Sequence, residues 1–402
     1  MSMTDGVSRR TLLGAAALAG VPVLRAQAQK PDPVTVGVLT DASGPYGDSG
    51  GRGSLLAARM AVADFGGVVL GEPVRIKFGD SENRPDVASA LARDWFDKGG
   101  VDAITDLPVT PVALAVQEVA KEKHRTVMIT AAAITEFTSK LCSPYSTHWA
   151  DDAHAMTTMT ARQVVKDGGD TWFFLTVDFS FGRALQAAAT SVIEANGGKV
   201  LGVATFPIGN TDFSAQLLRA STSGAKVMGF AAVGDDLVGA IKQSAEFGLA
   251  GGTGKTLAAF LVYLTDIHAL GLQAAQGLAL SSGFYWDQTD ASRAFAQRFF
   301  AEHKAMPTRN QASVYLSTRH FLKAAAQAGT RDALAIGKAM RALPVDYFGH
   351  PANLRADGRV MYDVTLYRVK APADSHAPWD YYTPIGTMPA AEAFLPMNPA
   401  CA

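Results

Sequence analysis

The sequence has no excess of charge of either sign and few histidines. Its 402 residues carry 36 basic and 37 acidic side chains, which gives a formal net charge of −1. Nucleic acids and anionic membrane surfaces attract proteins with a clear positive excess, so neither is indicated as a partner. The eight histidines are scattered. The near pair, His148 and His154, does not have the spacing of one helical face, so no metal site is indicated.

Long hydrophobic runs are also missing. No segment approaches the roughly 18 uninterrupted apolar residues that mark a membrane-spanning helix. The apolar run 12–24 is shorter, follows Arg9 and Arg10, and precedes the small-x-small pattern Ala26-Gln27-Ala28. This arrangement is typical of an export signal, so we expect residues 1–28 to be removed. The paired arginines resemble a twin-arginine signal, and Sec export stays open. A buried N-terminal helix is the structural alternative.

Cysteine is almost absent, with Cys142 and Cys401 as the two representatives. An exported protein matures in an oxidising compartment, which favours pairing of the two thiols. Such a bond would tie the last residues of the sequence to the middle of the chain. Two unpaired thiols are the alternative.

The stretch 44–53 contains Gly-Asp-Ser-Gly-Gly, the pentapeptide around the nucleophile of chymotrypsin-like proteases, with Ser49 at its centre. A serine nucleophile needs a histidine within hydrogen-bond reach. In the chymotrypsin order that histidine precedes the serine, whereas the first histidine here is His124, and Arg52 stands where the protease family has proline. Nor does a G-x-S-x-G motif follow a strand. A hydrolase using Ser49 is therefore a remote alternative.

From residue 34 onward, short apolar runs alternate with amphipathic helical patterns, in two consecutive series. Continuous apolar strands separated by such helices indicate parallel sheets covered on both faces. Two such units in one chain predict an α/β protein with two lobes and a cleft between them. The expected elements are 34–39, 55–62, 74–78, 87–96, 103–105, 112–120 and 126–130 in the first series, and 171–177, 184–194, 200–206, 213–219, 226–231, 237–247 and 257–262 in the second.

After residue 278 the pattern changes to helices at 293–303, 314–328 and 333–341, followed by a strand at 360–369. These elements cannot form a third sheet alone, so we expect them to complete the two lobes. The tail contains Pro378-Trp-Asp-Tyr-Tyr382, too many large apolar side chains for a flexible linker. The expected organisation is a first lobe of residues 31–148 plus 279–350, a second lobe of residues 149–278 plus 351–370, and a packed C-terminal strap of residues 371–402.

Several short motifs, in this order, resemble the extracytoplasmic leucine/isoleucine/valine-binding protein family, the solute receptors of ABC importers. They are Ser43-Gly-Pro-Tyr-Gly47, Asp178-Phe-Ser-Phe-Gly182, Asn210-Thr-Asp-Phe-Ser214 and Gln243 to Gly248. The tail at 378–382 looks like that of one subgroup. The resemblance covers nearly all of the chain after the export signal. It implies a type I periplasmic-binding fold, in which two doubly wound parallel-sheet lobes are joined by a three-crossing hinge.

The glycine-rich stretch follows the first strand, at the sheet edge where ligands lie in open α/β sheets, and Tyr46 is its aromatic side chain. In the family, a serine or threonine and backbone amides after the third and fourth strands take the ligand carboxylate. The resemblance places those groups at residues 108–110 and 132–133. The ligand-binding residues expected from position and resemblance are Tyr46, Val109, Thr110, Ala132, Ala133, Phe181, Gly234, Tyr263, Tyr285 and Trp286.

One departure from the family concerns the ligand's charge. Amino-acid binders place a glutamate in the second lobe to receive the ligand ammonium, whereas residues 261–263 here are Leu-Val-Tyr. An unpaired cation in a dry cleft is costly. With aromatic residues as expected walls, an aromatic or other apolar carboxylate is at least as well indicated as an amino acid, with Asp235 or Asp236 as alternative partners for a cation.

The sequence therefore predicts a periplasmic, non-enzymatic, monomeric receptor that closes on a small organic ligand and docks on a membrane permease. No cofactor or metal is expected. A ligand-sensing module that signals to a partner is the alternative.

Overall fold

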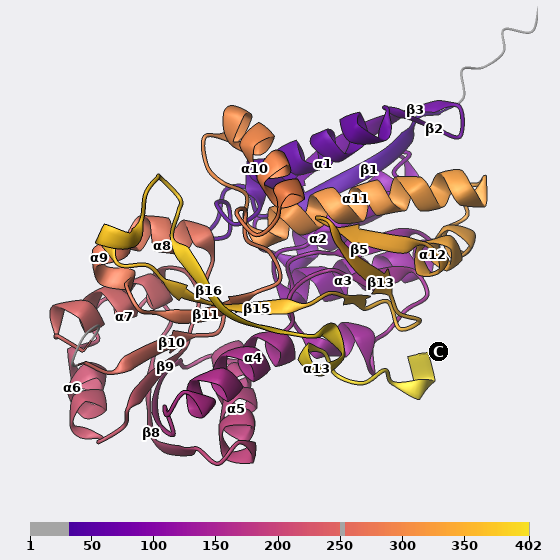
Figure 1. Cartoon of the computed structure of the whole chain (residues 1–402). Coiled ribbons are helices and arrows are strands. Elements are labelled where there is room, and N and C mark those ends of the chain that lie inside the picture. The colour runs from indigo at the N-terminus through magenta and orange to yellow at the C-terminus, as the bar shows by residue number, and fades with distance from the viewer. Residues whose placement is uncertain (1–31, 250–253, 402) are drawn as a thin grey trace, which may run out of the picture. The chain divides into compact units, whose positions relative to one another are not determined.

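The computed structural model describes residues 32–249 and 254–401. The expected export signal lies outside these residues. Two large sheets dominate, each covered by helices on both faces, and a small third sheet accompanies them (Figure 1). The first lobe is defined below as the six-stranded sheet with its helices, and the second lobe as the seven-stranded sheet with its helices.

The first sheet has the strand order β2-β3-β1-β4-β5-β6. All neighbouring pairs are parallel except β2 with β3. Helices α1 and α11, which lie side by side in Figure 1, pack with α10 on one face, and α2 and α3 pack on the other. The strands are β1 (Val34–Thr40), β2 (Val68–Val69), β3 (Glu72–Asp80), β4 (Ala103–Asp106), β5 (Thr126–Ile129) and β6 (Ser146–His148). The helices are α1 (Gly51–Phe65), α2 (Pro85–Asp97), α3 (Thr110–Lys123), α10 (Asp290–His303), α11 (Arg309–Ala328) and α12 (Ala333–Ala342).

Strand β1 lies at the centre of this sheet and is buried along its whole length. Its side chains alternate between two cores: Val36 and Val38 face α1 and α11, whereas Leu39 faces α2 and α3. This two-sided burial explains why the strand reads as a continuous apolar run.

The second sheet has the order β16-β15-β11-β10-β9-β7-β8. Strands β7 to β11 are parallel, and β15 and β16 close one edge antiparallel. The strands are β7 (Thr171–Val177), β8 (Lys199–Phe206), β9 (Val227–Ala231), β10 (Thr256–Ala259), β11 (Ala279–Ser282), β15 (Val364–Val369) and β16 (Tyr382–Met388). The helices of this lobe are α4 (Ala153–Lys166), α5 (Ser180–Ala195), α6 (Ser214–Thr222), α7 (Gly234–Glu246), α8 (Leu264–Leu270) and α9 (Leu272–Ala275).

Two expectations about the later part of the chain differ from the structure. Strand β11 was expected with the first lobe, but it pairs with β10 and β15 in the second sheet. The expected strand 360–369 is split between β14 (Val360–Met361) and β15. The split falls at Tyr362, whose ring stacks on Tyr347 with 4.2 Å between the centroids. Strand β14 instead joins β12 (Pro344–Tyr347) and β13 (His350–Leu354) in a small antiparallel sheet that the sequence pattern did not predict.

Within the described residues, the chain passes between the two large sheets through three segments, at 149–152, 283–289 and 362–363. The buried carboxylate of Asp151 connects all three. It accepts hydrogen bonds from the backbone N–H of Gly283 at 3.0 Å and from the hydroxyl of Tyr362 at 2.7 Å. The guanidinium of Arg309 lies 3.6 Å from the same carboxylate. Partnered in this way, a buried charge can be held in the hinge at acceptable cost.

The tail after β15 crosses the two lobes once more. Strand β16 belongs to the second sheet, and α13 (Ala390–Ala393) then packs beside α4. The ring of Phe394 lies against Tyr362 in the hinge, with 5.2 Å between the centroids. Cys401 forms a disulfide with Cys142 of the first lobe, which confirms the pairing predicted from the sequence. Trp379 is buried. The chain end is therefore fixed to both lobes.

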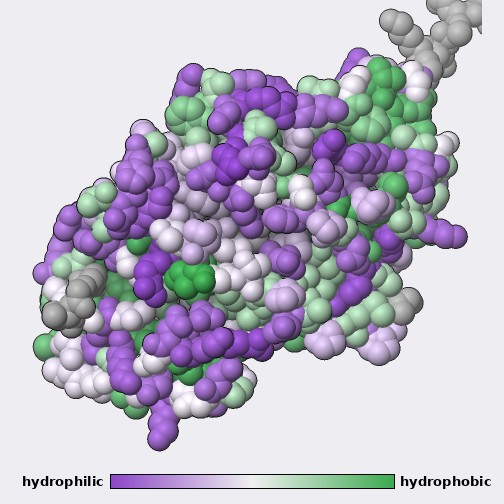
Figure 2. All heavy atoms as spheres, in the orientation of Figure 1, coloured by the Kyte–Doolittle hydropathy of each residue, from purple (hydrophilic) through white to green (hydrophobic). Residues whose placement is uncertain are grey.

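Hydrophilic residues cover most of the face shown in Figure 2, and hydrophobic residues appear there in separate small groups. Among the described residues, no helix combines the length and the apolar character needed to cross a bilayer.

Candidate functional site

A cavity of about 510 Å³ lies between loops of the two lobes. Its walls come from the segments that follow the carboxyl ends of parallel strands in both sheets, the edge at which open α/β sheets hold ligands. We refer to it as the interlobe cavity. The first lobe contributes Pro45, Tyr46, Asn83, residues 108–111 and residues 131–133. The second lobe contributes Val177, Phe179, Phe181, Ile208, Gly209, residues 233–236, Leu261 and Tyr263.

Four helices begin at this cavity. Their N-cap residues, which all line it, are Val109 of α3, Phe179 of α5, Val233 of α7 and Tyr263 of α8. At the first three, no side chain caps the helix. The backbone N–H groups of a first helical turn have no intrahelical partner, and the helix dipole makes this end positive. The cavity is therefore suited to an anionic group of a ligand.

The charged side chains at the cavity are acidic. Asp235 and Asp236 line it, whereas no lysine, arginine or histidine is found among the described residues of its wall. Asp236 accepts a hydrogen bond from the backbone N–H of Gly209 at 2.9 Å, and burial raises the pKa of its carboxyl. An anionic group of a ligand would accordingly depend on N–H and hydroxyl donors. The carboxylates of Asp235 and Asp236 in the second lobe could accept a hydrogen bond from a ligand.

Apolar and aromatic side chains form most of the wall. Tyr263, Leu261, Ala133 and the partly buried Phe181 belong to one hydrophobic cluster across the two lobes. Tyr46 completes the aromatic part of the wall, and burial, with Tyr263 and Asp41 nearby, raises the pKa of its phenol to about 12. Tyr46 therefore stays protonated at neutral pH. It offers a hydrogen-bond donor within apolar surroundings.

The loop that carries Tyr46 is organised by Asp41. Its carboxylate accepts hydrogen bonds from the backbone N–H groups of Gly44 at 3.0 Å and Tyr46 at 3.1 Å. The hydroxyl of Ser49 donates to the carbonyl of Tyr46 at 3.1 Å. Within the described part of the chain, no histidine is hydrogen-bonded to Ser49. The hydroxyl supports a turn, and the Gly-Asp-Ser-Gly-Gly stretch lacks the geometry of a nucleophile and its base.

The N-terminus of α11 holds the loops of both lobes in place. On the first lobe, the side chain of Thr308 donates to the carbonyl of Ser49 at 2.6 Å. Toward the second lobe, Arg309 donates to the carbonyl of Val262 at 3.2 Å, and Asn310 donates to the hydroxyl of Tyr263 at 3.3 Å. One buried helix end thus positions both Tyr46, through its loop, and Tyr263.

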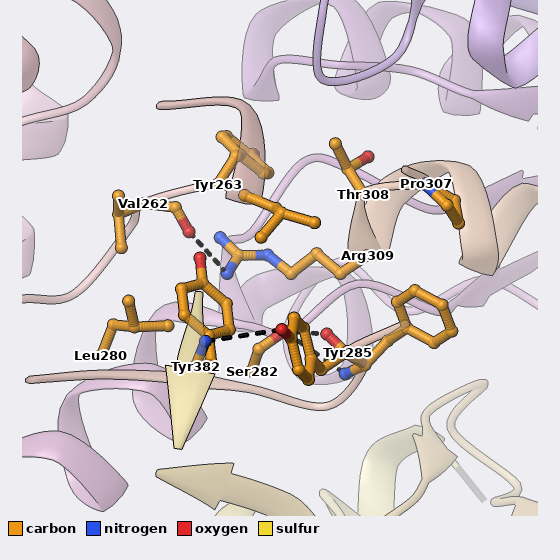
Figure 3. Close-up of a pocket in the computed structure, with 11 residues that line it drawn as sticks. Val262, Tyr263, Leu280, Ser282, Tyr285, Pro307, Thr308, Arg309 and Tyr382 are labelled. Carbon is orange, nitrogen blue, oxygen red and sulfur yellow. Dashed lines mark hydrogen bonds between the residues drawn. The ribbon is translucent and has the colours of Figure 1, made fainter. Parts of the chain in front are cut away.

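Figure 3 shows this helix end from the side of a second, much smaller cavity of about 10 Å³. The guanidinium of Arg309 points to the carbonyl of Val262 and stacks 4.5 Å from the ring centre of Tyr263. A space of this size admits about one water molecule. The small cavity therefore belongs to the packing of the hinge.

Eight of the ten sequence-predicted residues line the interlobe cavity, namely Tyr46, Val109, Thr110, Ala132, Ala133, Phe181, Gly234 and Tyr263. Gly234 has φ +62°, a left-handed backbone that favours glycine. The backbone N–H of Ala132 donates to the carbonyl of Leu107 at 3.1 Å, so this amide already has a partner.

Tyr285 and Trp286 do not line the interlobe cavity. Their side chains turn to the tail, where the Tyr285 hydroxyl and the Trp286 indole N–H donate to the carbonyl of Trp379 at 3.1 Å and 2.8 Å. Both polar groups thus have partners, and Tyr285 also packs against Tyr382. A contact with residues about 90 positions later gives no local sequence signal.

Asn83, Phe179 and Ile208 line the cavity but were not anticipated. Asn83 follows the carboxyl end of β3, so the positional rule that singled out Tyr46 also applied to it. An acid also lies close to Tyr263, where none was expected. Asp266 is half-buried, its carboxylate accepts from the Tyr263 backbone N–H at 2.8 Å, and desolvation raises its pKa to about 6. It caps α8 and does not line the cavity.

Residues 33–375 match the family model of the periplasmic binding proteins. The chain belongs to this family. The solved structure of a periplasmic binding protein from Burkholderia mallei is 42% identical, with a TM-score of 0.84 over 90% of this chain and 96% of the other. A branched-chain amino acid ABC transporter periplasmic ligand-binding protein from Burkholderia xenovorans is 36% identical, with a TM-score of 0.84 over 90% and 97%.

A curated relative, the Leu/Ile/Val-binding protein homolog 6 of Brucella melitensis, is 27% identical over 228 residues. That match spans 56% of this chain and 58% of the relative. The family assignment confirms the fold class predicted from the sequence, with parallel-sheet lobes on either side of a ligand cavity.

Proposed function

We propose that this periplasmic binding protein holds a small carboxylic acid with an aromatic or apolar body in the interlobe cavity and delivers it to the permease of an ABC importer. The single observation that carries the proposal is the pairing of an apolar, aromatic-walled cavity with uncapped helix N-termini from both lobes. A carboxylate takes the N–H groups, and the apolar body displaces water from the walls. Such a ligand contacts both lobes at once.

The carboxylate is assigned to the start of α3. Thr110 lies at the first helical position and lines the cavity. It has a hydroxyl, and a backbone N–H at this position has no intrahelical partner. Pro111, at the next position, has no N–H, so the hydroxyl of Thr110 gains weight as a donor. The first turn of α7, at Gly234, supplies the matching donors from the second lobe.

Closure follows from this division of the contacts. Only the closed arrangement lets one ligand touch α3 of the first lobe and α7 of the second, so ligand binding favours that arrangement. The closed form is the one that we expect a permease to accept. Export to the periplasm by the arginine-containing signal of residues 1–28 completes the proposal, with the twin-arginine route as the variant to test.

An aromatic acid is favoured over an α-amino acid by the aromatic wall, whereas Asp235 offers the second lobe a partner for an ammonium. Proteins of the same fold from Rhodopseudomonas palustris, 18% and 22% identical to this chain, have been solved with benzoate and with 4-hydroxybenzoate. The fold can therefore hold aromatic acids of this size.

Thermal unfolding with a panel of benzoate, 4-hydroxybenzoate, phenylacetate, leucine and valine tests the proposal. A ligand present at 100 times its Kd stabilises the folded state by about 2.7 kcal/mol, which raises the Tm of a protein of this size by about 3–4 °C. Thr110→Val keeps the shape of the side chain and removes its hydroxyl, so it should weaken binding of the active acid. Native mass spectrometry of protein from its own host should show a retained acid. Absence of both a shift and a retained ligand would refute the receptor function.

A further inference from the structure

Asn83 is a polar residue in the mostly apolar wall of the interlobe cavity, and its amide is not used by the fold. The side-chain oxygen Oδ1 is buried and has no hydrogen-bond partner. Buried polar atoms of this kind are rare in folded proteins, because each lost bond to water is uncompensated. An acceptor left open at the wall of a ligand cavity indicates a hydrogen bond that a ligand completes.

The backbone holds this amide in an unusual conformation. Glu82 and Asn83 have φ values of +51° and +55°, in the left-handed region that L-residues rarely adopt. The carboxylate of Asp80 fixes the turn by accepting from the N–H groups of Glu82 at 2.9 Å and Ala42 at 3.0 Å. Such backbone outliers persist where the surroundings determine them, and they cluster at ligand clamps. The second bond also ties the turn to the loop of Tyr46.

The sheet sets the distance between this amide and the proposed carboxylate position. Strands β3 and β4 both pair with β1, on opposite sides, so Val38 of β1 lies between Phe78 and Thr105. Asn83 follows β3 and Thr110 follows β4, so the strands that carry their loops are two strand spacings apart, about 10 Å. Hydrogen bonds of about 2.8 Å at each end leave room for a ligand whose two polar groups are several ångströms apart.

We propose that Asn83 reads a hydrogen-bond donor at the end of the ligand distal to its carboxylate. The site then selects acids with a hydroxyl or amino group across an apolar body. The inference rests on the proposed function. The α-ammonium of an amino acid lies on the carbon next to the carboxylate, which is too close to it to reach Asn83. A ligand analogue without the donor binds more weakly to such a site, because the acceptor oxygen of the protein then stays without a hydrogen-bond partner.

Calorimetric titration of the mature protein with benzoate, 3-hydroxybenzoate, 4-hydroxybenzoate and 4-aminobenzoate tests this selectivity. The wild-type protein should bind an acid with a distal donor at least tenfold more tightly than benzoate. Comparison of 3-hydroxybenzoate with 4-hydroxybenzoate distinguishes the position of the donor on the ring. Comparison of 4-aminobenzoate with 4-hydroxybenzoate distinguishes an amine from a hydroxyl donor. Equal affinity for benzoate and all three substituted acids would overturn the inference.

Asn83→Gly removes the amide and suits the left-handed backbone, so the fold is preserved. It should reduce the preference to threefold or less while the Kd for benzoate changes little. Asn83→Asp retains an acceptor oxygen and should retain the preference for the donor-bearing acid. Asn196→Ala, at the exposed end of α5, is the matched control and should behave as the wild type. A preference that survives Asn83→Gly would overturn the inference and leave the receptor function intact, whereas failure of every carboxylic acid to bind would refute the proposed function itself.

Discussion

The disulfide between Cys142 and Cys401 provides the largest single stability effect that can be worked out from the connectivity. The cysteines are 259 residues apart in sequence. In the chain-entropy model, closing a loop of that size removes about 19 cal/mol/K from the unfolded state, which is about 5–6 kcal/mol at 25 °C. We therefore expect the double variant Cys142→Ser, Cys401→Ser to be less stable than the oxidised wild type.

The measured loss should be smaller than this bound. Noncovalent contacts also hold the tail, including the 2.8 Å hydrogen bond from Arg355 to the carbonyl of Leu395 and the 2.8 Å ion pair of Arg162 with Glu392. Both are solvent-exposed, so the last residues can detach before the fold opens. An expected loss of about 2–4 kcal/mol follows, within the usual range for disulfides.

Guanidinium unfolding followed by circular dichroism measures the effect. The midpoint should fall, and the m-value should rise because the unfolded chain without the cross-link exposes more surface. Wild-type protein unfolded in a reducing agent should reproduce the variant, which separates the cross-link from the side-chain change. A variant with an unchanged midpoint and an unchanged m-value would refute the reasoning.

Three further predictions concern the interior and the cavity wall. Tyr263→Phe and Asn310→Ala should each lower the free energy of unfolding by about 1–2 kcal/mol. Because both remove the same hydrogen bond, the loss of free energy in the double variant should be smaller than the sum of the two single losses by about 1 kcal/mol. Strictly additive losses in denaturant unfolding would contradict this. Gly79→Ala should lower the Tm by several degrees, because the new methyl group would lie 2.6 Å from the ring of Trp95; calorimetry that shows no change would argue against the close contact. Burial raises the pKa of Asp106 to about 6. The stability that the protonated carboxyl contributes is therefore fully present below about pH 4 and is lost as the pH rises through 6. Between pH 4 and 7 the free energy of unfolding of Asp106→Asn should accordingly rise by up to about 3 kcal/mol relative to that of the wild type. Parallel pH profiles of the two proteins would contradict this.

The strands of both lobes were predictable because their burial is two-sided. Strand β1 is buried at all seven positions, and such a run has few other interpretations. Strands β12 to β14 were not predictable, because an antiparallel sheet of this size has short strands with exposed residues. Strand β11, four residues long, was placed in the wrong lobe. The alternation of strands and helices ends at residue 278, just before this strand, and the lobe boundary was drawn there.

The candidate site divides in the same way. Residues at the ends of strands, such as Tyr46 and Thr110, were found because the carboxyl edge of a parallel sheet is a position that sequence order defines. Tyr285 also follows a strand, yet its hydroxyl is bonded to the tail at Trp379. Asn310 could not be predicted as a partner of Tyr263, because it lies on a helix of the first lobe that follows much later in the sequence. Its hydrogen bond to Tyr263 crosses from the first lobe to the second.

Strand β16 has a consequence for the order of folding. It follows every other strand of the second sheet in the chain and pairs with β15, so the edge of that sheet stays open until about residue 388 has been synthesised. Cys401 lies later still and closes a loop that includes the whole second lobe. Non-local pairings of this kind form slowly. A nascent chain would thus carry an unpaired sheet edge while residues 283–388 are synthesised, first at β11 and then at β15. A chaperone that covers this edge would hold the protein in a state that has folded helices and an unfinished hinge.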